Sequence, residues 1–140
     1  MTTTAAICNS FKQELLAMTP HTAADVYKIA LYTDAGATLN KSTTAYTATG
    51  EITGTGYTAG GMNLAGFSVT LDTDTAILDW TTDPAWATST ITADTALIYN
   101  SSRTNKAVAV LKFTSATSTA AAFTVALPAA TAAAGTVRFV

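Results

Sequence analysis

The chain has 140 residues, with seven Lys or Arg against nine Asp or Glu and a formal net charge of -2, so it lacks the clustered cations that bind nucleic acid through its phosphates. A single cysteine excludes an internal disulfide framework, and the apolar residues lie in runs too short for a membrane-spanning helix. Threonine and alanine make up about two fifths of the chain, whereas there is one histidine. This composition is typical of a structural or binding domain, and we expect no catalytic residue, cofactor or metal ion.

The length of the chain predicts a single domain, because domains typically have roughly 100–150 residues. We expect this domain to span residues 1–140, with an N-terminal segment over 1–22 that contains a short helix and with strands over 23–140. The apolar run at the N-terminus ends at Ile7, which is short for the core of an export signal, so we expect folding in the cytoplasm of the producing cell. Cys8 is expected to be a small buried apolar residue.

One short helix is predicted over residues 10–18. Phe11 and Leu15 fall four residues apart on one side of it, while Lys and Gln occupy the other side. Asn9 or Ser10 is expected to cap its first turn by accepting a backbone N–H.

From Asp25 onward the pattern changes to an alternation of apolar and polar residues, which predicts seven to nine short strands. Two hairpins are the clearest, one over 64–71 and 75–80 and the other over 96–100 and 106–113. Other strands are expected at 25–32, 89–91, 123–127 and 136–140, with a break in the strand pattern at Pro84. Residues 43–49 could form an edge strand or a loop, and residues 50–61 a glycine-rich loop or a bulged strand. The pattern favours one antiparallel β-sandwich, jelly-roll-like, with a single short helix.

Three groups of residues could carry chemistry, and the sequence favours a structural role for each. The glycines of Gly54–Gly61 have the wrong spacing for a dinucleotide-binding fingerprint. Asp72 and Asp74 lie in a predicted turn and lack the glycine and the further acidic ligand of a calcium loop. His21 has no second His or Cys with which to bind a metal, so we expect it to face solvent after the helix, although its sequence distance from Cys8 leaves a Cys–His pair open.

The order of five sequence blocks is similar to that of a known family. The blocks are Ile7–Leu16, Tyr27–Tyr32, Gly54–Gly61, Ala96–Ser101 and Lys106–Leu111, and the stretch from the first to the last of them is most of the chain. They resemble small virion proteins of tailed bacteriophages, most closely the capsid decoration, or cement, proteins of β-sandwich type. The resemblance implies a non-enzymatic protein, made in the host cytoplasm, that binds the outer capsid surface of the virion as a dimer or trimer and bridges major capsid subunits. It implies no nucleic-acid or membrane partner.

Four residues are expected to contact that partner: Phe11 and Leu15 in the N-terminal segment, Tyr57 in the glycine-rich loop, and Trp86 after the proline. Each of them could instead belong to the core, and both alternatives stay open here. Trp86 is the best candidate for an exposed anchor, since it lies off any clear predicted strand. An alternative function is a tail, fibre or receptor-binding module that recognises cell-surface carbohydrate by stacking on Tyr57, Tyr99 and Trp86.

Overall fold

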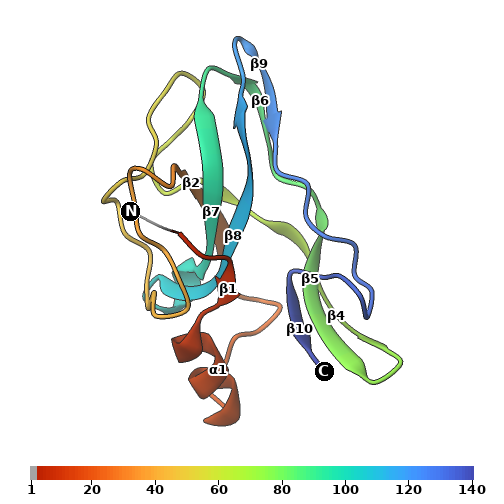
Figure 1. The fold of residues 1–140 in the computed structure, drawn as a ribbon. Helices are drawn as coiled ribbons and strands as arrows, with labels where there is room; N and C mark the ends of the chain where they lie inside the picture. Colours follow the sequence, from red (N-terminus) through yellow and green to blue (C-terminus); the bar gives the residue numbers. More distant parts are fainter. Residues whose placement is uncertain (1–2) are drawn as a thin grey trace.

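The structure, a computed structural model that describes residues 3–140, is mainly β with antiparallel sheets and one short α-helix, and it is β-sandwich-like as the alternation predicts (Figure 1). Over these residues the elements in chain order are β1 Ala6–Ile7, α1 Asn9–Leu16, β2 Tyr27–Tyr32, β3 Met62–Asn63, β4 Ala65–Asp72, β5 Thr75–Thr82, β6 Ala85–Ser89, β7 Thr92–Asn100, the 3-10 turn η1 Ser101–Arg103, β8 Lys106–Thr117, β9 Ala121–Thr124 and β10 Val137–Phe139.

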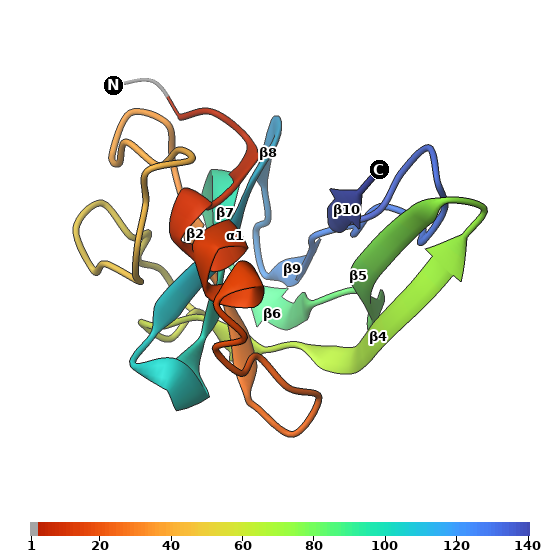
Figure 2. The same ribbon diagram turned by 90° about the horizontal axis from the view of Figure 1, so that it is seen from below.

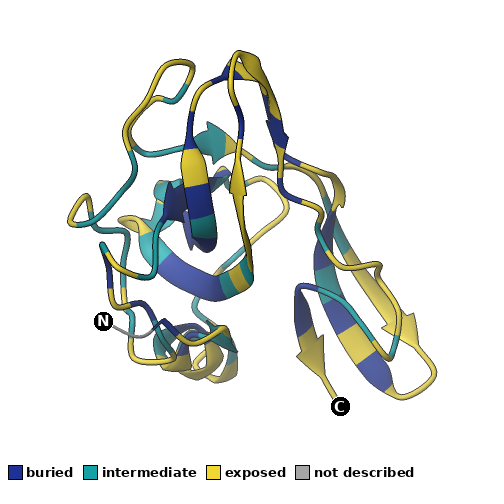
Figure 3. Ribbon diagram, turned by 45° about the horizontal axis from the view of Figure 1, so that its top comes forward, coloured by how far each residue is buried: buried dark blue, intermediate teal, exposed yellow. Residues whose placement is uncertain are grey.

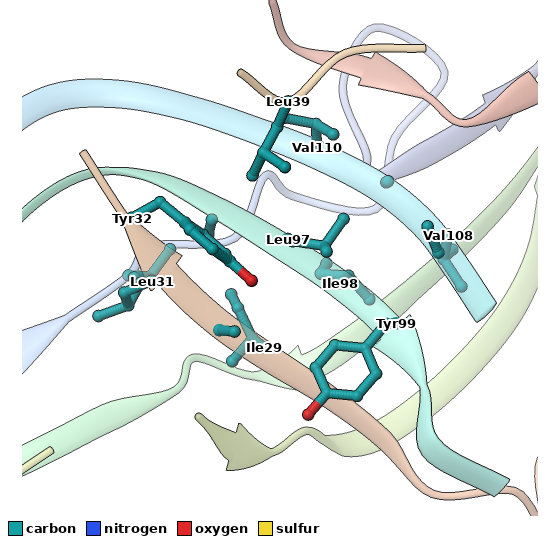
Figure 4. Packing of buried hydrophobic residues seen from close by; sticks show 14 of the residues in the cluster. Ile29, Leu31, Tyr32, Leu39, Leu97, Ile98, Tyr99, Val108 and Val110 are labelled. Carbon is teal, nitrogen blue, oxygen red and sulfur yellow. The ribbon is translucent and has the colours of Figure 1, made fainter. Parts of the chain in front are cut away.

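The main sheet has five strands in the order β1-β8-β7-β2-β3 and contains most of the core. Strands β2 and β7 pair antiparallel from Tyr27 opposite Asn100 to Tyr32 opposite Thr95. Their side chains are buried on both faces, because the apolar residues form nearly continuous runs there instead of alternating strictly with polar ones. Figure 4 shows this cluster, to which Leu39 from the loop after β2 also belongs.

A second sheet, with the order β10-β5-β4, is called the arm below. Its β4–β5 hairpin is the one that the sequence predicts over 64–80, and β10 pairs with the other edge of β5. The arm projects from the main sheet, as Figures 1 and 2 show. Its base packs on the core, because the ring centroids of Phe67 and Trp80 lie 5.2 and 5.3 Å from that of Tyr27.

The third sheet pairs β6 with β9 at the end of the molecule opposite to α1 (Figure 1). β6 begins at Ala85, directly after Pro84, so the proline separates β5 from β6 and the next strand starts earlier than the predicted Ser89. Trp86 lies within β6 opposite Phe123. The expectation that Trp86 lies off any strand was therefore wrong.

The N-terminal segment is held by the main sheet before the helix begins. Strand β1, which the sequence analysis missed, pairs with β8, and the backbone N–H of Cys8 donates to Val108 O at 3.0 Å. Cys8 is consequently the N-cap of α1 without a side-chain cap hydrogen bond, in place of the predicted Asn9 or Ser10, and the helix ends at Leu16.

The long connection between β2 and β3 is a loop throughout. Within it, segment 43–49 has one isolated bridge, between Ala45 and Lys106, which settles the choice between an edge strand and a loop in favour of the loop. The glycine-rich segment 50–61 is also a folded loop, as expected. It is tied to β2 by a bridge between Glu51 and Tyr32.

Candidate interaction surface

The arm has one apolar face that is uncovered toward its tip. Because cross-strand partners in an antiparallel sheet point to the same side, the register identifies the residues of this face. They are Phe67, Val69, Leu71, Ala76, Leu78, Trp80, Val137 and Phe139. Exposure rises along it from Trp80, which is 3% exposed at the base, to Val69 at 63% and Leu71 at 72%. Figure 3 shows the same contrast between the buried main sheet and the exposed β4.

The opposite face of the arm is covered over β5 by the chain itself, whereas Thr70 on the β4 part of that face is exposed. Segment 128–136 returns over it, and Thr136 Oγ1 donates a 2.6 Å hydrogen bond to Asp79 Oδ1. Ile77 and Asp79 on this face are both buried. Strand β5 is thus buried on this face, whereas the outer part of β4 is exposed on both faces, its apolar side at Val69 and Leu71 included.

The end of α1 forms a second apolar wall beside the uncovered face. Leu16 on this wall is 87% exposed. A hollow of about 450 Å³ is lined by Lys12, Leu15, Leu16 and Phe139, and another of about 200 Å³ is lined by Leu15, His21, Phe67, Val69, Ala76, Ile77, Leu78 and Phe139. The two hollows share Leu15 and Phe139, so they lie next to each other between helix and arm, and together we call them the apolar groove.

Charges occupy opposite ends of the apolar groove. Lys12 lines the helix side, while Asp74 lies at the β4–β5 turn that forms the tip of the arm. Asp72, which precedes this turn, points to the other face, where its carboxylate accepts from the backbone N–H of Ala132. The groove can thus receive a protein surface that is apolar in its centre and carries a charge of opposite sign at each end.

The four residues predicted to contact a partner have different positions. Leu15 lines the apolar groove. Phe11 is 0% exposed and packs edge-on against His21, and Trp86 is 7% exposed against Phe123. For Phe11 and Trp86 the core alternative is correct, and the expected exposed anchor at Trp86 was wrong. The alternation of apolar residues in β4 indicates an apolar face, but the sequence alone does not say whether another part of the chain covers that face.

Tyr57 is half-buried and belongs to a hydrogen-bonded cluster around Glu51. The carboxylate of Glu51 accepts from Tyr46 Oη and Tyr57 Oη, each at 2.6 Å, and from the backbone N–H of Gly60 at 2.7 Å. Tyr57 Oη in turn accepts from the N–H of Leu31 at 2.9 Å. Burial, together with the neighbouring Glu51, raises the pKa of Tyr46 to about 12 and that of Tyr57 further, so both phenols stay neutral and can donate.

This cluster ties the glycine-rich loop to β2 and leaves little basis for a sugar-stacking surface. Tyr99 is 3% exposed and its Oη donates to Gly60 O at 2.7 Å, while its ring stacks on Tyr46. Tyr57 lies with its centroid 5.7 Å from that of the buried Trp86. Of the three aromatic residues considered for carbohydrate binding, Tyr99 and Trp86 are therefore buried, and the half-buried Tyr57 is engaged with Glu51, Leu31 and Trp86.

A second polar cluster surrounds His21, whose side chain is 0% exposed, so the expectation that it faces solvent was wrong. Asn100 Nδ2 contacts His21 Nδ1 at 3.1 Å, which assigns Nδ1 as an acceptor and directs Nε2–H to Glu14, 2.6 Å away. Lys106 Nζ donates to the other oxygen of Glu14 at 2.7 Å. Both ring nitrogens are thus occupied by structural partners.

The same cluster continues to Asp25. Asn100 Nδ2 also donates to Asp25 Oδ2 at 2.9 Å, and Arg103 binds both oxygens of that carboxylate at 2.9 and 3.0 Å. The hydrogen bond from Arg103 is the main reason why the pKa of Asp25 lies far below its ordinary value. The chain of contacts fastens the segment after α1 to the β7–β8 turn. It was missed because its members lie far apart in the sequence.

Cys8 is fully buried, as expected, and burial raises the pKa of its thiol to about 11. Its sulfur therefore stays protonated at neutral pH, which does not favour a Cys–His nucleophile.

Within residues 3–140, no group of three or more His, Cys, Asp or Glu side chains is placed to hold a metal ion. In the same part of the chain, no helix has the length and apolar character needed to cross a bilayer. Comparisons with family models, curated proteins and solved structures found no match.

Proposed function

We propose that this chain is a structural virion protein of a tailed bacteriophage, which binds the outer capsid surface and stabilises the shell by bridging major capsid subunits. The observation that carries the proposal is that the molecule presents two separate surfaces suited to protein contacts, the apolar groove at one end and a surface rich in hydroxyl groups at the other, as a protein that bridges neighbours needs. Small chains rarely leave a contiguous apolar surface of this kind uncovered, and where they do it marks a contact with another protein. The five sequence blocks that resemble capsid decoration proteins give this contact its virion setting.

A bridging protein needs more than one contact surface, and the opposite end of the molecule supplies a candidate. The outer parts of β7 and β8 lie at that end together with β6 and β9 (Figure 1). The exposed residues of these strand parts are mainly threonine, serine and alanine. Thr92 and Thr117 join there through a 2.8 Å hydroxyl contact across the two strands. We call this region the hydroxyl-rich end. Small side chains and hydroxyls allow close approach and hydrogen bonding without the desolvation of full charges, so we assign the shell contact to this end.

The test is where the protein lies in the parent virion and how many copies are present. Cryo-electron microscopy, combined with quantitative mass spectrometry against the major capsid protein, is expected to find hundreds of regularly spaced copies on the shell. A handful of copies confined to the tail would contradict the proposal and favour a tail or receptor-binding module.

A binding experiment addresses the surface directly. Purified protein added to shells that lack it is expected to co-sediment with them. Thr117→Glu at the hydroxyl-rich end is expected to weaken this binding about tenfold or more, because the contact would bury a carboxylate without a partner. Thr70→Glu, a matched change on the arm, is the control. Equal binding by both variants would contradict the assignment of the shell contact to the hydroxyl-rich end.

A further inference from the structure

We infer that the apolar groove is the interface of a two-fold homodimer, in which the arm of each copy lies in the groove of the other. The inference goes beyond the proposed function and holds whether or not the protein binds a capsid. It identifies the occupant of the groove as a second copy of this chain.

The shape of the surface is self-complementary. The outer arm is a projecting sheet whose apolar face carries Val69 and Leu71, and the depression beside it is lined by Leu15, Leu16 and Phe139 on the same side of the molecule. A two-fold axis through such a surface brings each projection to the other copy's depression, because an isologous interface uses the same patch twice.

The exposed apolar area is sufficient for a dimer. The exposed parts of Leu16, Val69, Leu71 and Phe139, with the half-buried groove residues around them, amount to roughly 600 Å² per copy. Reciprocal contact would bury about 1,200 Å² of accessible surface, which lies at the lower end of the range for specific interfaces. An interface of this size is typical of a reversible rather than an obligate dimer.

The charges agree with the same arrangement. Insertion of the arm places its tip, with Asp74, toward the helix side of the partner's groove, where Lys12 lies. Each copy thus offers an acidic tip and a basic groove end, so the two-fold contact pairs opposite charges twice. Like charges at the two ends would have disfavoured self-association.

Sedimentation equilibrium of the purified chain tests the inference. The wild-type protein is expected to show a mass twice that of the 14.3 kDa chain, in reversible equilibrium with monomer. Leu71→Glu and Leu16→Glu should each weaken the dimer about tenfold or more, because each places a carboxylate in an apolar contact. Thr70→Glu, on the other face of the same strand, is the matched control and should leave the dimer intact. Circular dichroism confirms that each variant is folded.

A charge exchange gives a second and independent readout. Lys12→Glu and Asp74→Lys should each weaken the dimer, whereas the double variant, which restores opposite charges across the two-fold axis, should recover wild-type association. A wild-type chain that stays monomeric, or variants at Leu16 and Leu71 that dimerise like wild type, would overturn the inference. Neither result involves capsids, so the proposed shell contact is tested separately.

Discussion

At the scale of single residues, two buried polar clusters hold loops and turns in place. Glu51 is the centre of the first, since its carboxylate accepts hydrogen bonds from Tyr46, Tyr57 and Gly60. Glu51→Ala leaves these donors without an acceptor, and we expect it to lower the free energy of unfolding by about 3 kcal/mol in urea titrations. Tyr46→Phe removes one donor and is expected to lower it by about 1 kcal/mol. Equal effects of the two changes would contradict the central position of Glu51.

The second cluster predicts how stability depends on pH. The pKa of Asp25 is lower in the folded than in the unfolded chain because Arg103 binds its carboxylate. Burial alone would raise the pKa of Glu14, but hydrogen bonds from Lys106 and His21 lower it below its ordinary value. The unfolded state therefore binds more protons in acid, so this stabilisation is complete above the ordinary carboxyl pKa values of about 4 and is lost as the pH falls below them.

We expect the wild-type protein to lose stability steadily below about pH 4. Asp25→Asn should show a shallower dependence over the same range, even though it is less stable at neutral pH. Urea unfolding measured from neutral pH to about pH 2.5 compares the two slopes. Parallel curves for the two proteins would show that Asp25 does not contribute.

At the scale of elements, the glycine-rich loop reaches β2 because Gly61 takes a conformation with φ of +74° directly against it. A Cβ at this position would meet the carbonyl oxygen of Ile29. At Gly60, with φ of +91°, the corresponding Cβ would find Tyr99 Oη at 3.4 Å. Gly60 and Gly61 both have a positive φ, which is unfavourable for any other residue, but only at Gly61 would an added Cβ also clash with the backbone of β2.

This contrast gives a matched pair of substitutions. Gly60→Ala should lower the free energy of unfolding by about 1 kcal/mol through backbone strain alone. Gly61→Ala should lower it by about 3 kcal/mol or more, because β2 or the loop must also move. Chemical denaturation measures both, and a similar loss for the two variants would show that the loop does not press on β2.

At the scale of the whole molecule, a buried main sheet carries a partly exposed arm. Strands β2 and β7 are buried on both faces, whereas β4 is exposed over most of its length (Figure 3). The free energy needed to open a segment locally is lowest where few apolar contacts protect its backbone hydrogen bonds. Hydrogen exchange in the monomeric Leu71→Glu variant should therefore be fastest in β4 and slowest in β2 and β7. Protection of β4 equal to that of β7 would contradict this distribution of stability.

The sequence by itself determined the local elements. Alternation of apolar and polar residues predicted the β4–β5 and β7–β8 hairpins and the mainly β class, because the period of two is a property of the extended backbone. The Phe11–Leu15 spacing likewise predicted the helix, though not its cap, since β1 pairs with a strand about a hundred residues away.

Only the tertiary structure decided which of these residues are accessible and which polar groups meet. Phe11 is a core residue and Leu71 is exposed, although both belong to regular apolar patterns, and Trp86, which lies outside any clear pattern, is buried too, because burial depends on what packs over a face. His21 and Glu51 find partners on other strands and loops, so their contacts could not be inferred from neighbours in the chain. The apolar groove arises for the same reason: the sequence encodes an apolar face on β4, and the path of segment 128–136 leaves that face open.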